Sequence, residues 1–176
     1  MAQEGLWVAV LVLAGMAAWV DWRSRRIPNW LTVTGAALGF TLNTFLWGWN
    51  GAKSSLGGLV LILVLLLPLV VLRGLGAGDW KLMGALGAMV GIKQVLRMLV
   101  ATVLIAGLMA MVQITLRKRW RASLGNLGEL AKGSFVFGLR PHPVISLDNP
   151  TLLTLPFGVA AGIAAAVCYV LRFVNP

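Results

Sequence analysis

The chain is poor in the side chains that build disulfide frameworks and metal sites. Its 176 residues include one cysteine and one histidine. A single cysteine excludes an intrachain disulfide, and this pair of residues leaves no CxxC or HExxH zinc pattern. Cys168 lies near the end of the last apolar run and His142 stands alone in a polar stretch, so neither suggests thiol or Ser-His catalysis. We therefore expect no metal and no cofactor.

Charge is also scarce, and most of it is of one sign. Only 11% of the residues are charged and 59% are hydrophobic, whereas soluble domains are about a quarter charged and about half apolar. This composition predicts an all-α integral membrane protein, and the helix-length apolar runs exclude a barrel of alternating strands. The net charge of +10 would suit nucleic acid, but the basic residues gather in short loops between apolar runs. That arrangement encodes membrane topology, so we expect a lipid bilayer and not nucleic acid as the partner.

Six apolar runs predict one domain over residues 1–176, folded as a six-span helical bundle. The fourth run has 13 residues, fewer than the roughly 20 that cross a bilayer, so it is either tilted or extended backwards through Asp79. Its glycines Gly84, Gly87 and Gly91, with Gly87 and Gly91 as a GxxxG pair, let other helices approach closely and predict a central position. A cytoplasmic loop is expected at 117–150. The expected spans are 5–20, 30–49, 56–72, 80–92, 98–116 and 151–171.

The distribution of basic residues predicts the orientation of this bundle. No basic residue precedes the first run, which argues against a cleaved signal peptide. Of the 15 basic residues, all but Lys53, Lys93, Arg97 and Arg172 lie in or beside the loops that follow spans one, three and five. An excess of Lys and Arg marks the cytoplasmic side, so both termini are expected outside.

The same alternation of loops between the two sides of the membrane places two carboxylates at one level of the bilayer. Asp21 ends the first span and Asp79 begins the fourth, both at the cytoplasmic side. A charge near the hydrocarbon core costs roughly 2.5 to 3.5 kcal/mol, so such a residue usually has a function and a partner. Two facing carboxyl groups share a proton, and one then acts as base while the other acts as acid.

Local ion pairing is the other interpretation of these two residues. Asp21 and Arg25 are one helical turn apart, and Asp79 is close in sequence to Lys81 and Arg73. Interfacial ion pairs of this kind contribute little energy. Spacing alone leaves both interpretations open.

Three motifs resemble one family of membrane proteases. Gly76-Ala77-Gly78-Asp79 matches the GxGD signature of intramembrane aspartyl proteases, and the stretch 21–29, DWRSRRIPN, resembles the first-aspartate motif of type IV prepilin peptidases. Leu155-Pro156-Phe157-Gly158, followed by Ala160-Ala161-Gly162, is similar to that family's last-helix motif. The chain is closest to the short branch that processes Flp-type pilins. It lacks the CxxC insert of the long branch, so N-methylation is not expected.

The resemblance implies an aspartic endopeptidase of the bacterial inner membrane. Asp21 and Asp79 would activate water to remove the basic leader of single-span type IV prepilins or pseudopilins at the cytoplasmic boundary. Gly76 and Gly78 would shape the loop where the substrate backbone approaches, because glycine leaves room and adopts torsions that other residues resist. The residues expected to bind substrate or support the site are Gly76, Gly78, Lys81, Arg25, Pro28 and Asn29, with Pro28 in the first turn of span two.

Two other classes of protein remain as alternatives. A noncatalytic subunit of a pilus or secretion assembly would need neither aspartate. A small ion-coupled transporter would need a polar path, whereas the middles of spans two, three, five and six carry almost no ionisable residue. An oligomer is compatible with the sequence, but no motif specifies one.

Overall fold

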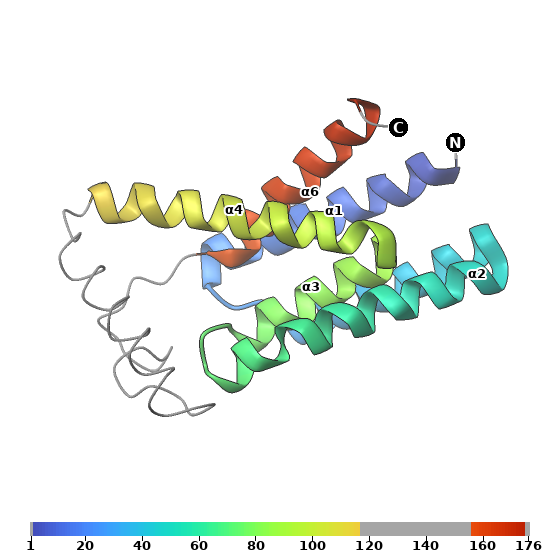
Figure 1. Cartoon of the computed structure of the whole chain (residues 1–176), viewed down its shortest axis with the longest axis horizontal. Helices are drawn as coiled ribbons and strands as arrows, with labels where there is room; N and C mark the ends of the chain where they lie inside the picture. Colours follow the sequence, from blue (N-terminus) through green and yellow to red (C-terminus); the bar gives the residue numbers. More distant parts are fainter. Residues whose placement is uncertain (1, 117–155, 175–176) are drawn as a thin grey trace.

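The computed structural model describes residues 2–116 and 156–174, and the secondary structure of this part of the chain is all α-helix, joined by short links (Figure 1). The expectation of an all-α protein is therefore confirmed for these residues. The predicted loop 117–150 and the beginning of the predicted last span, 151–155, lie outside them. The helices are α1 (Ala2–Ser24), α2 (Asn29–Val71), α3 (Ala77–Val90), α4 (Ile92–Leu116) and α6 (Phe157–Val174).

Three of these helices are long and apolar enough to cross a membrane: α1 over Gln3–Ser24, α2 and α4. Large apolar side chains cover their outer faces; Phe45, Val64 and Leu104 are all exposed. In water such surfaces would associate, whereas lipid tails solvate them without cost. The chain is a membrane protein.

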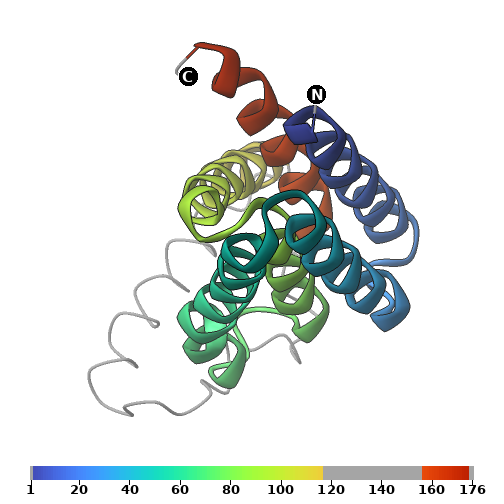
Figure 2. The same cartoon turned by 90° about the vertical axis from the view of Figure 1, so that its right-hand side faces the viewer.

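The helix α2 consists of two arms that run back along one another (Figures 1 and 2). Its backbone leaves the helical conformation at Trp47 and Gly48, and Gly48 has a φ of 57°, which favours glycine. The arms correspond to the predicted runs 30–49 and 56–72. However, the interval 50–55 that the predicted spans leave between them is helical, and the chain reverses earlier, at Trp47 and Gly48.

The helix α3 occupies the centre of the bundle. It contacts each of the other described helices, and residues 82–90 are all buried. The helix α6 lies between α1 and α4 (Figure 2). A Cβ atom on Gly87 would lie 2.6 Å from the carbonyl oxygen of Gly58, so the α2 and α3 backbones touch there. The predicted central position and close approach are confirmed, but Gly91 ends α3 with a φ of 77° and does not continue a helical GxxxG stripe.

Buried polar side chains donate hydrogen bonds to the C-terminal end of α3. With 14 residues, α3 is about 21 Å long, which is shorter than the roughly 30 Å of a hydrocarbon core. Its last carbonyl groups therefore need donors from the protein. Asn43 Nδ2 lies 3.1 Å from Ala88 O and 2.9 Å from Met89 O, and Ser55 Oγ donates to Ala88 O at 2.7 Å.

Several helix boundaries differ from the predicted ones, among them the end of α1 and the beginnings of α3 and α4. The helix α1 continues through Ser24, so Asp21 is helical and is not the first residue of a loop. The helix α3 begins at Ala77, which confirms the backward extension through Asp79. The helix α4 begins at Ile92 and not at 98, because Gly91 alone is enough to break the chain between α3 and α4.

The polar contacts at the end of α3 predict a specific loss of stability in Asn43→Leu. That variant keeps the branching of the side chain at Cγ but removes the donor to Ala88 and Met89, and we expect a cost of about 1–3 kcal/mol. Thermal unfolding of purified protein in detergent measures it.

Thr44→Val is the matched control, because Thr44 donates only within its own helix, to Phe40 O at 2.7 Å. It should stay within about 0.5 kcal/mol of the parent protein. Equal stability of the Asn43 and Thr44 variants would contradict the capping role.

Candidate active site

Asp21 lies in the last turn of α1 and is held there by the beginning of α6. Its side chain is 5% exposed, and Oδ2 accepts a hydrogen bond from the backbone N–H of Gly158 at 2.7 Å. The carbonyl of Pro156 accepts the first helical bond of α6, from Val159, so the N–H of Gly158 is free for a partner outside the helix. The positive end of the α6 dipole adds to the stabilisation of a carboxylate.

The absence of a side chain at Gly158 makes this contact possible. A Cβ atom there would lie 2.9 Å from Asp21 Cβ and 3.0 Å from Asp21 Oδ2. The first distance is shorter than real Cβ contacts and the second is unusually short, so any side chain would displace the carboxylate or the helix. Gly158 is therefore a positioning residue for Asp21.

After Asp21 the chain turns sharply toward α3. Arg25 ends α1 with a φ of 51°, and its N–H donates to Asp21 O at 2.8 Å. The turn places Ile27 against Gly78, where a Cβ atom would lie 3.3 Å from Ile27 Cβ. Gly78 thus allows the link between α1 and α2 to lie on the first turn of α3. Pro28 caps α2, which begins at Asn29, and so it is not in the first turn as predicted.

Asp79 is the third residue of α3 and reaches back to the residue that caps the helix. Its carboxylate accepts the backbone N–H of Gly76, in the same way that an acidic residue closes a capping box. A Cβ atom on Gly76 would lie 3.0 Å from Asp79 Oδ2. The backbone of Gly76 has a φ of −67°, which any residue adopts. The predicted need for unusual torsions at Gly76 is therefore wrong; this glycine provides space.

These elements bring the two predicted aspartates to the same end of the bundle. The α1 and α3 helices are in contact, and the charge of Asp21 acts on the partly buried Asp79. The positive charge of Arg25 also acts on Asp21. The Asp21 carboxylate accepts its hydrogen bond from the Gly158 N–H. Each carboxyl group accepts a backbone N–H at the beginning of a helix. The donor to Asp21 belongs to α6, and the donor to Asp79 belongs to α3.

Two of the predicted supporting residues contact each other beside this pair. Lys81 Nζ donates to Asn29 Oδ1 at 2.9 Å, which joins α3 to the first residue of α2. The contact therefore links α3 to the beginning of α2, two residues after Ile27. No group of three metal-ligating side chains occurs within residues 2–116 and 156–174.

Gly158 is the functional residue that the sequence did not identify as such. It was named only as part of the last-helix motif and not among the expected site residues. The available signal is the order Pro156-Phe157-Gly158, because proline begins helices and a glycine two residues later presents a bare N–H. Nothing in the sequence indicates that this N–H meets Asp21, which is 137 residues away.

The described helices thus place two carboxyl groups at one end of a helical membrane protein, within electrostatic range of one another. The model of the type IV leader peptidase family matches residues 8–111, which include both Asp21 and Asp79 and cover more than half of the chain. The chain belongs to this family. No curated protein and no solved structure matches it.

The Gly158 contact predicts that Gly158→Ala lowers leader-peptidase activity by roughly a hundredfold, the scale on which small misplacements of reacting groups act. The measurement is the rate of leader removal by purified protein. The variant should still accumulate in the membrane, because one added methyl group does not prevent insertion.

Gly162→Ala is the matched control on the same helix. Its Cβ atom would lie 3.0 Å from Ala18 Cβ and 3.2 Å from Ala14 O, so it strains the same interface without touching Asp21. It should retain far more activity than Gly158→Ala. Equal losses would show that packing, and not the position of Asp21, is what matters.

Proposed function

We propose that this leader peptidase is an aspartic endopeptidase in which Asp21 and Asp79 together activate water. The observation that carries the proposal is the convergence of these two carboxyl groups, from the end of α1 and the beginning of α3, within electrostatic range. They are the only carboxylates among the described residues apart from Glu4, which lies near the opposite end of α1. Membership of the leader peptidase family favours this enzyme over a transporter or a noncatalytic subunit.

Hydrolysis by such a pair needs one ionised and one protonated carboxyl group. The ionised group takes a proton from water while the water oxygen attacks the scissile carbonyl, and the protonated group donates its proton to the developing oxyanion. The tetrahedral intermediate then breaks its C–N bond, and the amine leaves with a proton from the pair. The two products are the leader with a free carboxylate and the mature chain with a free amine.

The backbone contacts of the pair support this chemistry. The N–H groups of Gly158 and Gly76 donate to Asp21 and Asp79 and restrict their rotation. The Lys81–Asn29 hydrogen bond ties α3 to α2 close to Asp79. Gly78 faces Ile27, so its role in the proposed enzyme is to allow the α1–α2 link to approach α3 and not to line an open substrate channel.

The proposed substrate is a single-span type IV prepilin of the Flp type, held by its apolar helix in the same membrane. The excess of Lys and Arg beside the loops at the Asp21 end supports a cytoplasmic position for that end in the proposal, on the side where the basic leader of the substrate would lie. Counting both arms of α2 and the shorter α3 and α6, the proposal includes six spans in the bacterial inner membrane with both termini outside.

The pair mechanism predicts that Asp21→Asn and Asp79→Asn each abolish leader removal, with a loss of at least about a thousandfold. Asparagine keeps the shape of the side chain but cannot exchange the proton. The double variant should be no worse than either single variant, because residues that act as a unit are not additive. The measurement is the shift of a co-expressed Flp-type prepilin to its mature length.

Asp148→Asn is the control, because it removes a carboxylate that the mechanism does not use. It should process the prepilin normally. Normal processing by Asp79→Asn, or activity that follows only the abundance of each variant, would contradict the pair mechanism and favour local ion pairing.

A further prediction concerns the product. The chain lacks the CxxC insert of the long branch, so cleavage should leave an unmethylated amine. Mass spectrometry of pilin matured by this protein alone should give the unmodified mass, and a product heavier by one methyl group would contradict the proposal.

A further inference from the structure

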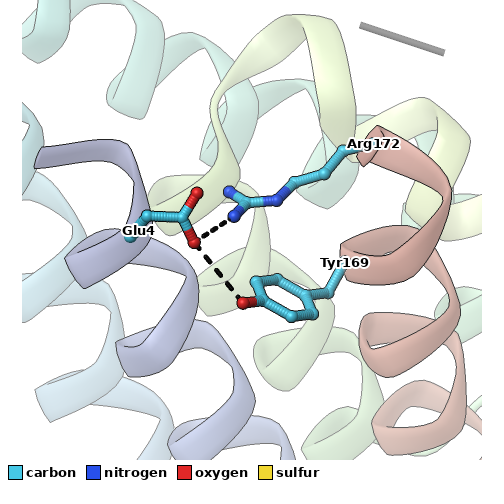
Figure 3. Close-up of polar contacts among 3 residues, drawn as sticks. All are labelled: Glu4, Tyr169 and Arg172. Atoms are coloured by element: carbon cyan, nitrogen blue, oxygen red, sulfur yellow. Dashed lines mark hydrogen bonds and ion pairs between the residues drawn. The ribbon is translucent and has the colours of Figure 1, made fainter. Parts of the chain in front are cut away.

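A polar cluster joins α1 and α6 at the end opposite to Asp21. Glu4 lies in the first turn of α1 and Arg172 in the last turn of α6, and Arg172 Nη2 donates to Glu4 Oε2. Figure 3 shows that Tyr169 directs its hydroxyl to the same carboxylate oxygen, at 3.4 Å. We refer to Glu4, Trp7, Tyr169 and Arg172 as the terminal cluster.

Aromatic rings hold the guanidinium of Arg172 in place. Its Cζ lies 5.5 Å from the ring centre of Trp7 and 4.5 Å from that of Tyr169, within the range of cation–π attraction. Trp7 is 2% exposed, and its ring centre is 6.1 Å from that of Tyr169. The side chain of Arg172 is 16% exposed and that of Glu4 is 50% exposed. The guanidinium of Arg172 is therefore largely buried beside the two rings, whereas the Glu4 side chain is half exposed.

Between the terminal cluster and Asp21, the two helices meet through small side chains. Gly162 lies against Ala14 and Ala18, and Gly158 against Ala17 and Asp21, so the helices run antiparallel. Small residues allow close contact but offer few large side chains that interlock. Such an interface resists separation better than it resists sliding. Polar contacts are well suited to fixing the register of two helices.

We propose that the Glu4–Arg172 pair of the terminal cluster fixes the axial register of α6 along α1 and thereby keeps the Gly158 N–H on Asp21. Arg172 lies roughly 21 Å along α6 from Gly158, so the pair does not contact the reacting atoms. Glu4 and Arg172 are therefore positioning residues. The catalytic consequence rests on the proposed role of Asp21, whereas the register itself does not.

A disulfide reports the register independently of activity. The Cβ atom of Ala18 lies 3.0 Å from the Cβ position of Gly162, slightly closer than the roughly 3.8 Å of a disulfide. Ala18→Cys with Gly162→Cys, in a Cys168→Ala background, should therefore form a bond on oxidation with copper phenanthroline. Protection of both thiols from a polyethylene glycol maleimide measures the yield in the full-length protein.

Glu4→Gln and Arg172→Met should lower this disulfide yield and, without the cysteines, lower kcat for leader removal by roughly ten- to a hundredfold with little change in KM. Arg172→Lys, which keeps a cation beside Trp7 and Tyr169, should stay closer to the parent in disulfide yield and in kcat than Arg172→Met. Closing the disulfide in the Arg172→Met protein should restore kcat, because the bond replaces the lost constraint.

Lys53→Met is the matched control. Lys53 Nζ lies 5.6 Å from the ring centre of Trp49, so it is another cation over a tryptophan, and the α2 turn that carries it lies at the same end of the bundle as the termini (Figure 1). Its disulfide yield and kcat should equal those of the parent.

Unchanged kcat in Glu4→Gln and Arg172→Met would overturn the proposal, as would a loss of kcat with unchanged disulfide yield. If Arg172→Met fails to accumulate, Glu4→Gln decides, since Glu4 is half exposed. If the parent removes no leader at all, the proposed function fails, and the disulfide yields still test the register.

Discussion

The hydrogen bond from the Gly158 N–H to Asp21 Oδ2 is the contact on which the arrangement of this enzyme depends. It joins the last helix to the first across 137 residues, and it uses a free donor of the α6 terminus to hold a buried carboxylate. Three independent features serve it: Pro156 begins the helix, Gly158 lacks a side chain, and the small residues of α1 let α6 come close.

The position of Asp79 depends on how a short helix is held inside the bundle. The α3 helix cannot cross a bilayer by its length, so both of its ends require partners from the protein. At its C-terminal end Asn43 and Ser55 supply donors to the last carbonyl groups, and at its N-terminal end Asp79 itself accepts the N–H of Gly76. The helix is thus anchored from both directions, and Asp79 is held at a defined depth.

The sequence was sufficient to predict the helical membrane class, the central place of α3 and the position of Asp21 and Asp79 at one end of the bundle, because hydrophobic runs and the alternation of loops can be recognised from local composition. It was not sufficient where distant residues decide. The reversal at Gly48 was misplaced because Ser55, which looks like a turn residue, is buried and donates to α3. The role of Gly158 was missed because its partner belongs to another helix. Gly76 was assigned the wrong physical reason, since its torsions are ordinary.

The pH dependence of kcat/KM for leader removal tests the central claim most directly. A pair that works with one ionised and one protonated carboxyl group is active only between its two proton losses, so the account predicts a bell-shaped profile whose two limbs belong to the pair. A single limb, or a rate that does not change from acid to neutral pH, would contradict the joint action of Asp21 and Asp79.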